Sequence, residues 1–231
     1  MILKKIPGDR MNKGKIKEAY AKYYIADWIE IGSNLLFFVL SFIPALGSKE
    51  EHQMSVAMFF LVISIAELIL YFWEHGPKKK GSTVRAQAGM LLVTGDILLL
   101  MQTVSIIAIM YEMRIKDDTP LMASNLFLAI AYGIFAIWRM VTGIHRIIKN
   151  GKKDAYQAAL SGVMMVCAVY TFSLFVDYML IVNNAANYIW PRYFMIAYMG
   201  ATTLLLAIWM QIKAINILKN GWMSASEPDQ K

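Results

Sequence analysis

Three ionisable residues stand inside long apolar runs of this sequence, where a charged side chain is costly. Counted at 1.5 Å per helical residue, Glu67 lies about 9 Å before Trp73, Asp96 about 12 Å after Ala88, and Arg139 about 9 Å before His145. A charge at the centre of a bilayer costs about 2.5 to 3.5 kcal/mol on the insertion scale. If these three residues share one layer, the arginine offsets one carboxylate and leaves the other to bind a proton or a cation. Glu30 is a shallower candidate for the same polar site.

The same residues also have structural explanations. Arg139 shares a helical face with Arg146, so its side chain can extend toward the lipid headgroups. Glu67 can pair with Arg139, and Asp96 can be neutral and hydrogen-bonded. Two hypotheses therefore stand: a site that handles protons, cations or a small solute, and a structural or regulatory protein, stress-related or partner-stabilising, whose polar cluster only fixes helix register.

Motifs that would indicate an enzyme or a metal site are missing from the sequence. There is no Gly-x-Ser-x-Gly elbow, no glycine-rich phosphate loop and no His-Glu-x-x-His. The one cysteine, Cys167, lies inside an apolar run, and the three histidines stand at the ends of runs or between them. We expect a non-enzymatic protein without a metal ion or another cofactor.

The apolar runs themselves predict an all-α integral membrane protein. Of the 231 residues, 58% are apolar and 17% are charged, which is too little charge to cover a soluble domain. Runs of about 20 apolar residues, the length that crosses a bilayer, recur six times. They are Ala26 to Ala45, Met54 to Trp73, Ala88 to Tyr111, Leu121 to Val141, Ala158 to Val182 and Tyr193 to Ile212.

Lys and Arg are distributed unevenly over the segments that join these runs. Of the 23 basic residues, 18 fall before the first run, after the last, or in every second connection, and four fall in the other connections. Basic residues resist translocation, so the pattern predicts that both termini are cytoplasmic. The short loops favour a bacterial inner membrane. Because the net charge of +7 is spread over membrane-proximal segments, we do not expect nucleic-acid binding.

Three regions follow from these patterns. Residues 1–25 form a basic N-terminal segment, residues 26–218 the six-helix transmembrane domain, and residues 219–231 a cytoplasmic tail. The N-terminal segment predicts an amphipathic helix on anionic lipids of the cytoplasmic leaflet; the alternative is a solvated tail that only sets orientation. Its membrane-binding residues are Lys13, Lys15, Lys17 and Lys22.

The six runs pair into three hairpins with short external turns. The three returning runs end alike, with a Trp followed by Gly and basic residues, which suggests a threefold hairpin repeat. The alternative is convergence, since Trp favours the interface and Gly ends helices. The partner that the sequence predicts is the lipid bilayer itself, and a homo-oligomer is compatible with it.

Two stretches carry a resemblance to a known family. Residues 133–148, Gly-Ile-Phe-Ala-Ile-Trp-Arg-Met-Val-Thr-Gly-Ile-His-Arg-Ile-Ile, and residues 94–98, Thr-Gly-Asp-Ile-Leu, resemble the returning and outgoing helices of the HdeD-like family of bacterial six-span membrane proteins. The resemblance implies six spans arranged as three hairpins and an association with acid stress. It implies no catalytic residues.

Overall fold

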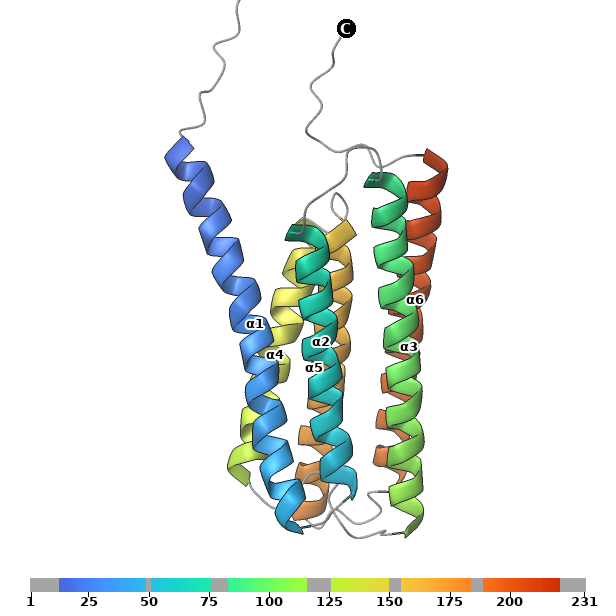
Figure 1. Ribbon diagram of the computed structural model, residues 1–231. Helices are drawn as coiled ribbons and strands as arrows, with labels where there is room; N and C mark the ends of the chain where they lie inside the picture. The colour runs from blue at the N-terminus through green and yellow to red at the C-terminus, as the bar shows by residue number, and fades with distance from the viewer. Residues whose placement is uncertain are drawn as a thin grey trace, which may run out of the picture.

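The computed structural model describes residues 13–48, 51–75, 83–115, 126–149, 155–183 and 189–220, which are helical except for a turn at Asn183. Consecutive helices run in opposite directions (Figure 1). This arrangement confirms the predicted all-α fold with six helices long and apolar enough to span a membrane. The helices are α1 Lys13–Ser48, α2 Glu51–His75, α3 Thr83–Ile115, α4 Leu126–Lys149, α5 Ala155–Val182 and α6 Ile189–Asn220.

The side chains are distributed as in a protein whose solvent is lipid. Large apolar residues cover the outside of the bundle, including Leu100 at 69% exposure and Ile148 at 71%. Charged side chains are buried inside it, among them Glu67 and Arg139, at 1% and 0% exposure. The chain is a multi-pass membrane protein.

All six helices extend beyond the runs from which they were predicted, and α4 and α1 show why. α4 continues past Val141 to Lys149, because Arg139 and Arg146 interrupt the hydropathy of the run without interrupting the helix. α1 begins at Lys13 and is continuous through the predicted boundary at residue 25, so residues 13–25 of the basic segment are helical and in line with the first span. The side chains of Lys13, Lys15, Lys17 and Lys22 lie outside the described part of the structure, as does the tail after Asn220.

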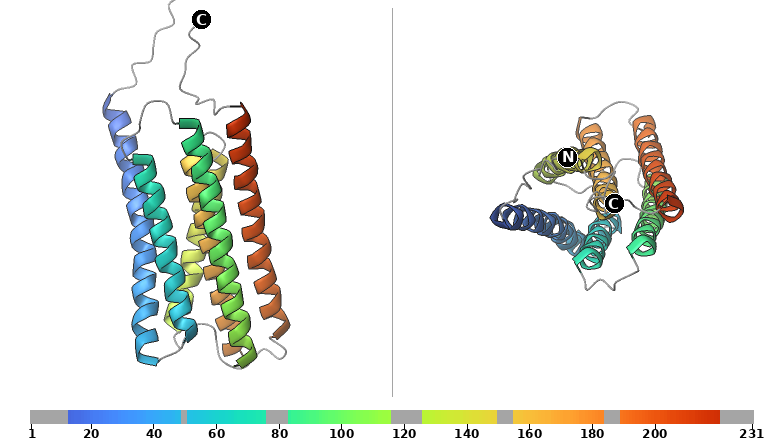
Figure 2. Two further views of the ribbon diagram at one scale, coloured as in Figure 1. Left: turned by 45° about the vertical axis from the view of Figure 1, so that its right-hand side comes forward. Right: turned by 90° about the horizontal axis from the view of Figure 1, so that it is seen from above.

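The helices pack as three antiparallel pairs, which are α1 with α2, α4 with α5, and α3 with α6 (Figures 1 and 2). α5 lies in the centre of the bundle and also contacts α2, α3 and α6. Helices that follow each other in the chain as a predicted hairpin do not always pack on each other. In the described residues α3 and α4 make no contact, so the packing does not follow the predicted threefold hairpin repeat.

Candidate functional site

Arg139 and Glu67 form an ion pair in the interior of the bundle. Arg139 Nη1 donates a hydrogen bond of 2.8 Å to Glu67 Oε1, and both side chains have no exposed surface. Arg139 Nη2 donates to the backbone carbonyl of Glu30 over 2.8 Å. The guanidinium also lies 5.0 Å from the centre of the Phe135 ring. Arg139 therefore contacts α1 and α2 instead of extending to the headgroups.

Asn34 adds a hydrogen bond to the second oxygen of Glu67. Asn34 Nδ2 donates to Glu67 Oε2 over 2.8 Å, so both carboxylate oxygens have a partner. Asn34 Oδ1 accepts from Cys167 Sγ of α5 at 3.7 Å. The contacts around Glu67 thus join α1, α2, α4 and α5.

A second arginine lies two turns further along α4 and binds two carboxylates of α1. Arg146 Nη1 and Nη2 donate to Asp27 Oδ1 over 3.1 and 3.2 Å, and Nη2 donates to Glu30 Oε1 over 2.7 Å. Tyr156 of α5 donates its hydroxyl to Asp27 Oδ2 over 2.9 Å. Gln157 Oε1 accepts a longer bond of 3.4 Å from Arg146 Nη1.

Helical spacing explains why these residues meet. Positions separated by three, four or seven residues share a face of a helix. Asp27, Glu30 and Asn34 have that spacing on α1, and Arg139 and Arg146 have it on α4. We call the side chains of Asp27, Glu30, Asn34, Glu67, Arg139, Arg146 and Tyr156 the polar network.

The polar network holds more negative than positive groups. Among its described side chains three carboxylates face two guanidinium groups. Two members of the network have incomplete bonding among the described residues, because Glu30 Oε2 and Arg139 Nε are buried and have no hydrogen-bond partner there. Glu30 is the carboxylate of the two. A buried charge without a partner is costly, so the surplus negative charge favours a bound proton or cation at Glu30.

Aromatic rings close the bundle on one side of the polar network. Phe37, Phe60, Tyr132 and Phe135 contact one another with ring centres 4.5 to 6.4 Å apart. They come from α1, α2 and α4 and are all buried. Beyond them Ser41 and Tyr132 share a hydrogen bond between α1 and α4. The network therefore ends at an apolar layer.

The prediction that Asp96 joins Glu67 and Arg139 is wrong. Asp96 is exposed on α3, and its Oδ1 accepts a hydrogen bond of 3.2 Å from Gln211 of α6. Thr94 and Leu98 face α2, and a residue two positions from each is about 200° away around a helix. Asp96 therefore points away from the polar network. The structure brings together Glu30, Glu67 and Arg139 of the four predicted residues.

Sequence reasoning missed Asp27 and Tyr156 because both stand at the ends of apolar runs, where polar residues are common. The signal for Asp27 is its spacing from Glu30 and Asn34. Asp177, near the end of α5 and outside the polar network, is also fully buried.

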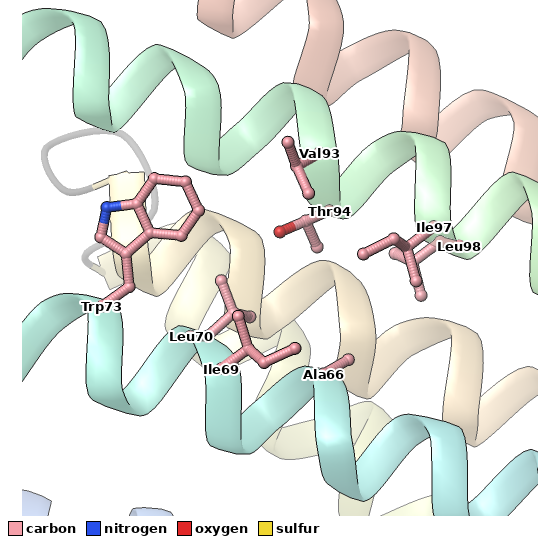
Figure 3. Close-up of a pocket in the computed structure, with 8 residues that line it drawn as sticks. All are labelled: Ala66, Ile69, Leu70, Trp73, Val93, Thr94, Ile97 and Leu98. Carbon is pink, nitrogen blue, oxygen red and sulfur yellow. The ribbon is translucent and has the colours of Figure 1, made fainter.

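An apolar groove lies between α2 and α3, outside the polar network. Ala66, Ile69, Leu70 and Trp73 line it from α2, and Val93, Thr94, Ile97 and Leu98 line it from α3 (Figure 3). Ile69 and Val93 are about half exposed, so the groove opens on the lipid-facing surface. The groove carries no charged group, and it is not part of the candidate site.

Over the described ranges no three His, Cys, Asp or Glu side chains are placed to hold a metal ion. Searches with family models, curated proteins and solved structures give no match to the chain. The candidate site therefore depends on its own geometry, and the resemblance to the HdeD-like family stays a prediction.

Proposed function

We propose that this multi-pass protein is a non-enzymatic transport protein that handles protons, with Glu30 as the group that takes up and releases the proton. The observation that carries the proposal is the charge imbalance of the polar network. Two arginines face three buried carboxylates, and Glu30 Oε2 has no hydrogen-bond partner among the described residues. A proton on Glu30 makes the network neutral, which a low-dielectric interior favours.

The position of Glu30 supports exchange with one side of the membrane. Asp27 is the first residue of its span, and Arg146 lies two residues before the end of its own at Ile148. Glu30 is one helical turn deeper than Asp27, about 4.5 Å at 1.5 Å per residue. A proton thus has a short polar route to Glu30 from this end of the bundle, while the aromatic layer blocks the other end.

This end is proposed to face the cytoplasm of a bacterium, because the basic connections flank it. The resemblance to the HdeD-like family supports the same membrane and a role under acid stress. Anionic lipids are the proposed partners of the basic N-terminal segment.

The direct test is pH-difference infrared spectroscopy of the purified protein in lipid. A carboxyl group that takes up a proton gains a C=O stretching band, and we expect Glu30→Gln to remove that band. The matched control is Asp96→Asn, which neutralises a carboxylate outside the polar network and must keep the band assigned to Glu30. A Glu30→Gln spectrum identical to that of the wild type refutes the assignment.

Flux measurements test transport itself. Proteoliposomes with an internal pH dye should show proton entry above that of empty vesicles for the wild type and Asp96→Asn, but not for Glu30→Gln. Absence of wild-type flux, under both a pH gradient and a membrane potential, contradicts transport even if Glu30 binds a proton.

A specific observation favours the structural alternative. Arg139 bonds to α1 and α2 and Arg146 bonds to α1 and α5, so the two guanidinium groups tie four helices together. A protein that only needs fixed helix register would use such bonds. In that case replacing both Glu67 and Arg139 recovers the stability that is lost when Arg139 alone is replaced, and the protein exchanges no proton.

A further inference from the structure

α1 and α4 face each other without backbone packing. In the described residues no Cα atom of α1 lies within 8 Å of a Cα atom of α4. Their side chains nevertheless meet at three levels, separated by seven residues on each helix, and we call this contact the α1–α4 seam. At the first level Asp27 bonds to Arg146. At the middle level Asn34 and Arg139 both bond to Glu67, which lies between them. At the third level Ser41 bonds to Tyr132.

The packing relates the first three helices to the last three. α1 packs on α2 as α4 packs on α5, and α2 contacts α3 as α5 contacts α6. Because each helix reverses direction, the two halves start at opposite ends of the bundle (Figure 2). One contact has no counterpart: α3 packs on α5, but the equivalent helices α6 and α2 do not meet in the described part of the chain. This is the packing of an inverted repeat of two three-helix units.

One shift in residue number relates the two units. A shift of 105 places Gly95 on Gly200, and a Cβ at either glycine would face the other helix of the α3–α6 pair. Any antiparallel pair of helices has a local twofold axis, but here the same shift of 105 relates α3 to α6 and α1 to α4. Identical residues at this shift in α3 and α6 are Met90 and Met195, Gly95 and Gly200, Leu99 and Leu204, Leu100 and Leu205, and Ile107 and Ile212.

The same shift relates the two ends of the α1–α4 seam. It moves Asp27 to Tyr132 and Ser41 to Arg146, and it moves Asn34 to Arg139 at the middle level. The bridge from Asp27 to Arg146 is therefore the counterpart of the bridge from Tyr132 to Ser41. The pseudo-twofold axis passes between them, at the level of the pair of Glu67 and Arg139.

We infer that the α1–α4 seam is the route of the transported species and that its two end bridges open alternately. This inference rests on the proposed transport function and adds the route and the gates. Rocking of α1–α3 against α4–α6, about the packed contacts of α3 with α6 and of α2 with α5, breaks side-chain bonds at one end of the seam, where the described residues of α1 and α4 have no packed backbones to separate. The middle level, with Glu67 and Arg139, then faces one side of the membrane at a time.

Cys167 is a native reporter for this motion. It is the one cysteine of the chain, it is fully buried, and its Sγ lies 3.7 Å from Asn34 Oδ1 at the middle level. Its reaction with a small membrane-impermeant thiol reagent can be followed in membrane vesicles of either orientation. Tyr132→Phe and Tyr156→Phe each remove one hydroxyl, from opposite ends of the seam. Tyr198→Phe is the control, because Tyr198 is exposed on α6, a helix that packs on neither α1 nor α4 in the described residues.

We expect Tyr156→Phe to raise the labelling rate of Cys167 from one side of the membrane and Tyr132→Phe to raise it from the other. A lost hydrogen bond changes a two-state equilibrium by about two- to tenfold, so the labelling rates should rise by that factor, and Tyr198→Phe should leave them unchanged. An increase from the same side for both variants, or no increase for either, overturns the inference. Labelling does not depend on Glu30, so the infrared band and proton flux can fail or succeed independently.

Asp96 carries a second inference that is independent of the seam. It lies midway along the span from Val84 to Ile107 and is exposed on the bundle surface. Leu100 and Ile107 share this face of α3 and are 69% and 62% exposed. A carboxylate facing lipid at that depth is costly, and Gln211 bonds to only one of its oxygens among the described residues, so the surface favours a further polar partner at the same depth.

We propose that this face of α3 and α6 binds a second copy of the chain. A twofold axis along the membrane normal keeps every residue at its depth, so Asp96 of each copy can meet Gln211 of the other. Within one copy these two side chains are already 3.2 Å apart, which fixes their common depth.

The test is energy transfer between labelled copies diluted in liposomes. The wild type should remain dimeric, and the Asp96→Ala/Gln211→Ala variant should dissociate at least about tenfold more readily, the factor for one lost bond of 1.4 kcal/mol. The control is Thr142→Ala on α4, a polar position outside this face. A monomeric wild type, or an unchanged double variant, overturns the proposal.

Discussion

Arg139 and Glu67 stand 72 residues apart in the sequence, yet their side chains meet at 2.8 Å without any exposed surface. The pair joins α4 to α2, two helices whose backbones do not pack on each other in the described residues. Its bonds are therefore a main link between them, together with the aromatic contacts of Phe60 with Tyr132 and Phe135.

Replacing one partner of this pair should lower the free energy of unfolding far more than replacing both. Arg139→Gln leaves Glu67 buried without its main counter-charge, and we expect a loss of about 3 to 5 kcal/mol in the free energy of unfolding. Glu67→Gln/Arg139→Gln should recover most of that loss, because two amides can bond to each other. Unfolding in detergent, followed by circular dichroism, measures both.

Asp96→Asn is the control for these variants. It neutralises a carboxylate that is exposed and outside the polar network, so the free energy of unfolding of the monomer should change by less than about 0.5 kcal/mol. A double variant less stable than Arg139→Gln would contradict the pair as the source of the loss.

Arg146 should not tolerate replacement by lysine. Its planar guanidinium reaches Asp27 and Glu30 together, whereas the ammonium of a lysine is a single point charge on a shorter reach. We expect Arg146→Lys to lower the free energy of unfolding by about 1.5 to 3 kcal/mol, the value of a hydrogen bond to a charged group. Arg85→Lys, at an exposed position in the first turn of α3, should change it little. Equal effects of the two changes would mean that Arg146 acts only through its charge.

The sequence predicts the six spans well because one local property, an apolar run of sufficient length, decides them. Which faces of the helices meet is decided by tertiary packing. Asp96 shows the difference: its depth could be read from the sequence, but its direction depends on α3 packing against α6. Glu67 and Arg139 were paired correctly, since buried opposite charges in lipid have few other partners. Arg146 was seen to share the face of Arg139, but its two acceptors on α1 were not predicted.

The direction of insertion is tested by labelling introduced cysteines in a Cys167→Ser background. Cysteines at Ser48 and Asn184 should react with an impermeant reagent added to intact cells, because these connections carry few basic residues. Cysteines at Ser82 and Gly151 should react only after the cells are opened. Labelling of Ser82→Cys in intact cells would reverse the proposed orientation and place the entrance to Glu30 outside.

The last prediction concerns the basic residues at the start of α1. α1 is one continuous helix from Lys13 to Ser48, so its basic turns extend the first span beyond Asp27. A peptide of residues 1–24 should still bind anionic vesicles, since attraction to the surface is worth about 1 kcal/mol per basic residue within a Debye length. Replacing Lys13, Lys15 and Lys17 by Gln should therefore weaken its partitioning by about 3 kcal/mol in total.

Neutral vesicles and added salt separate this attraction from apolar binding. On neutral lipid the two peptides should partition equally, and at 1 M salt, where the Debye length is about 3 Å, most of the difference on anionic lipid should vanish. In the full chain the same replacements should leave insertion intact, because the other basic connections still set the orientation. If both peptides bind anionic vesicles equally at low salt, the three lysines make no contact with the surface and the segment is a solvated tail.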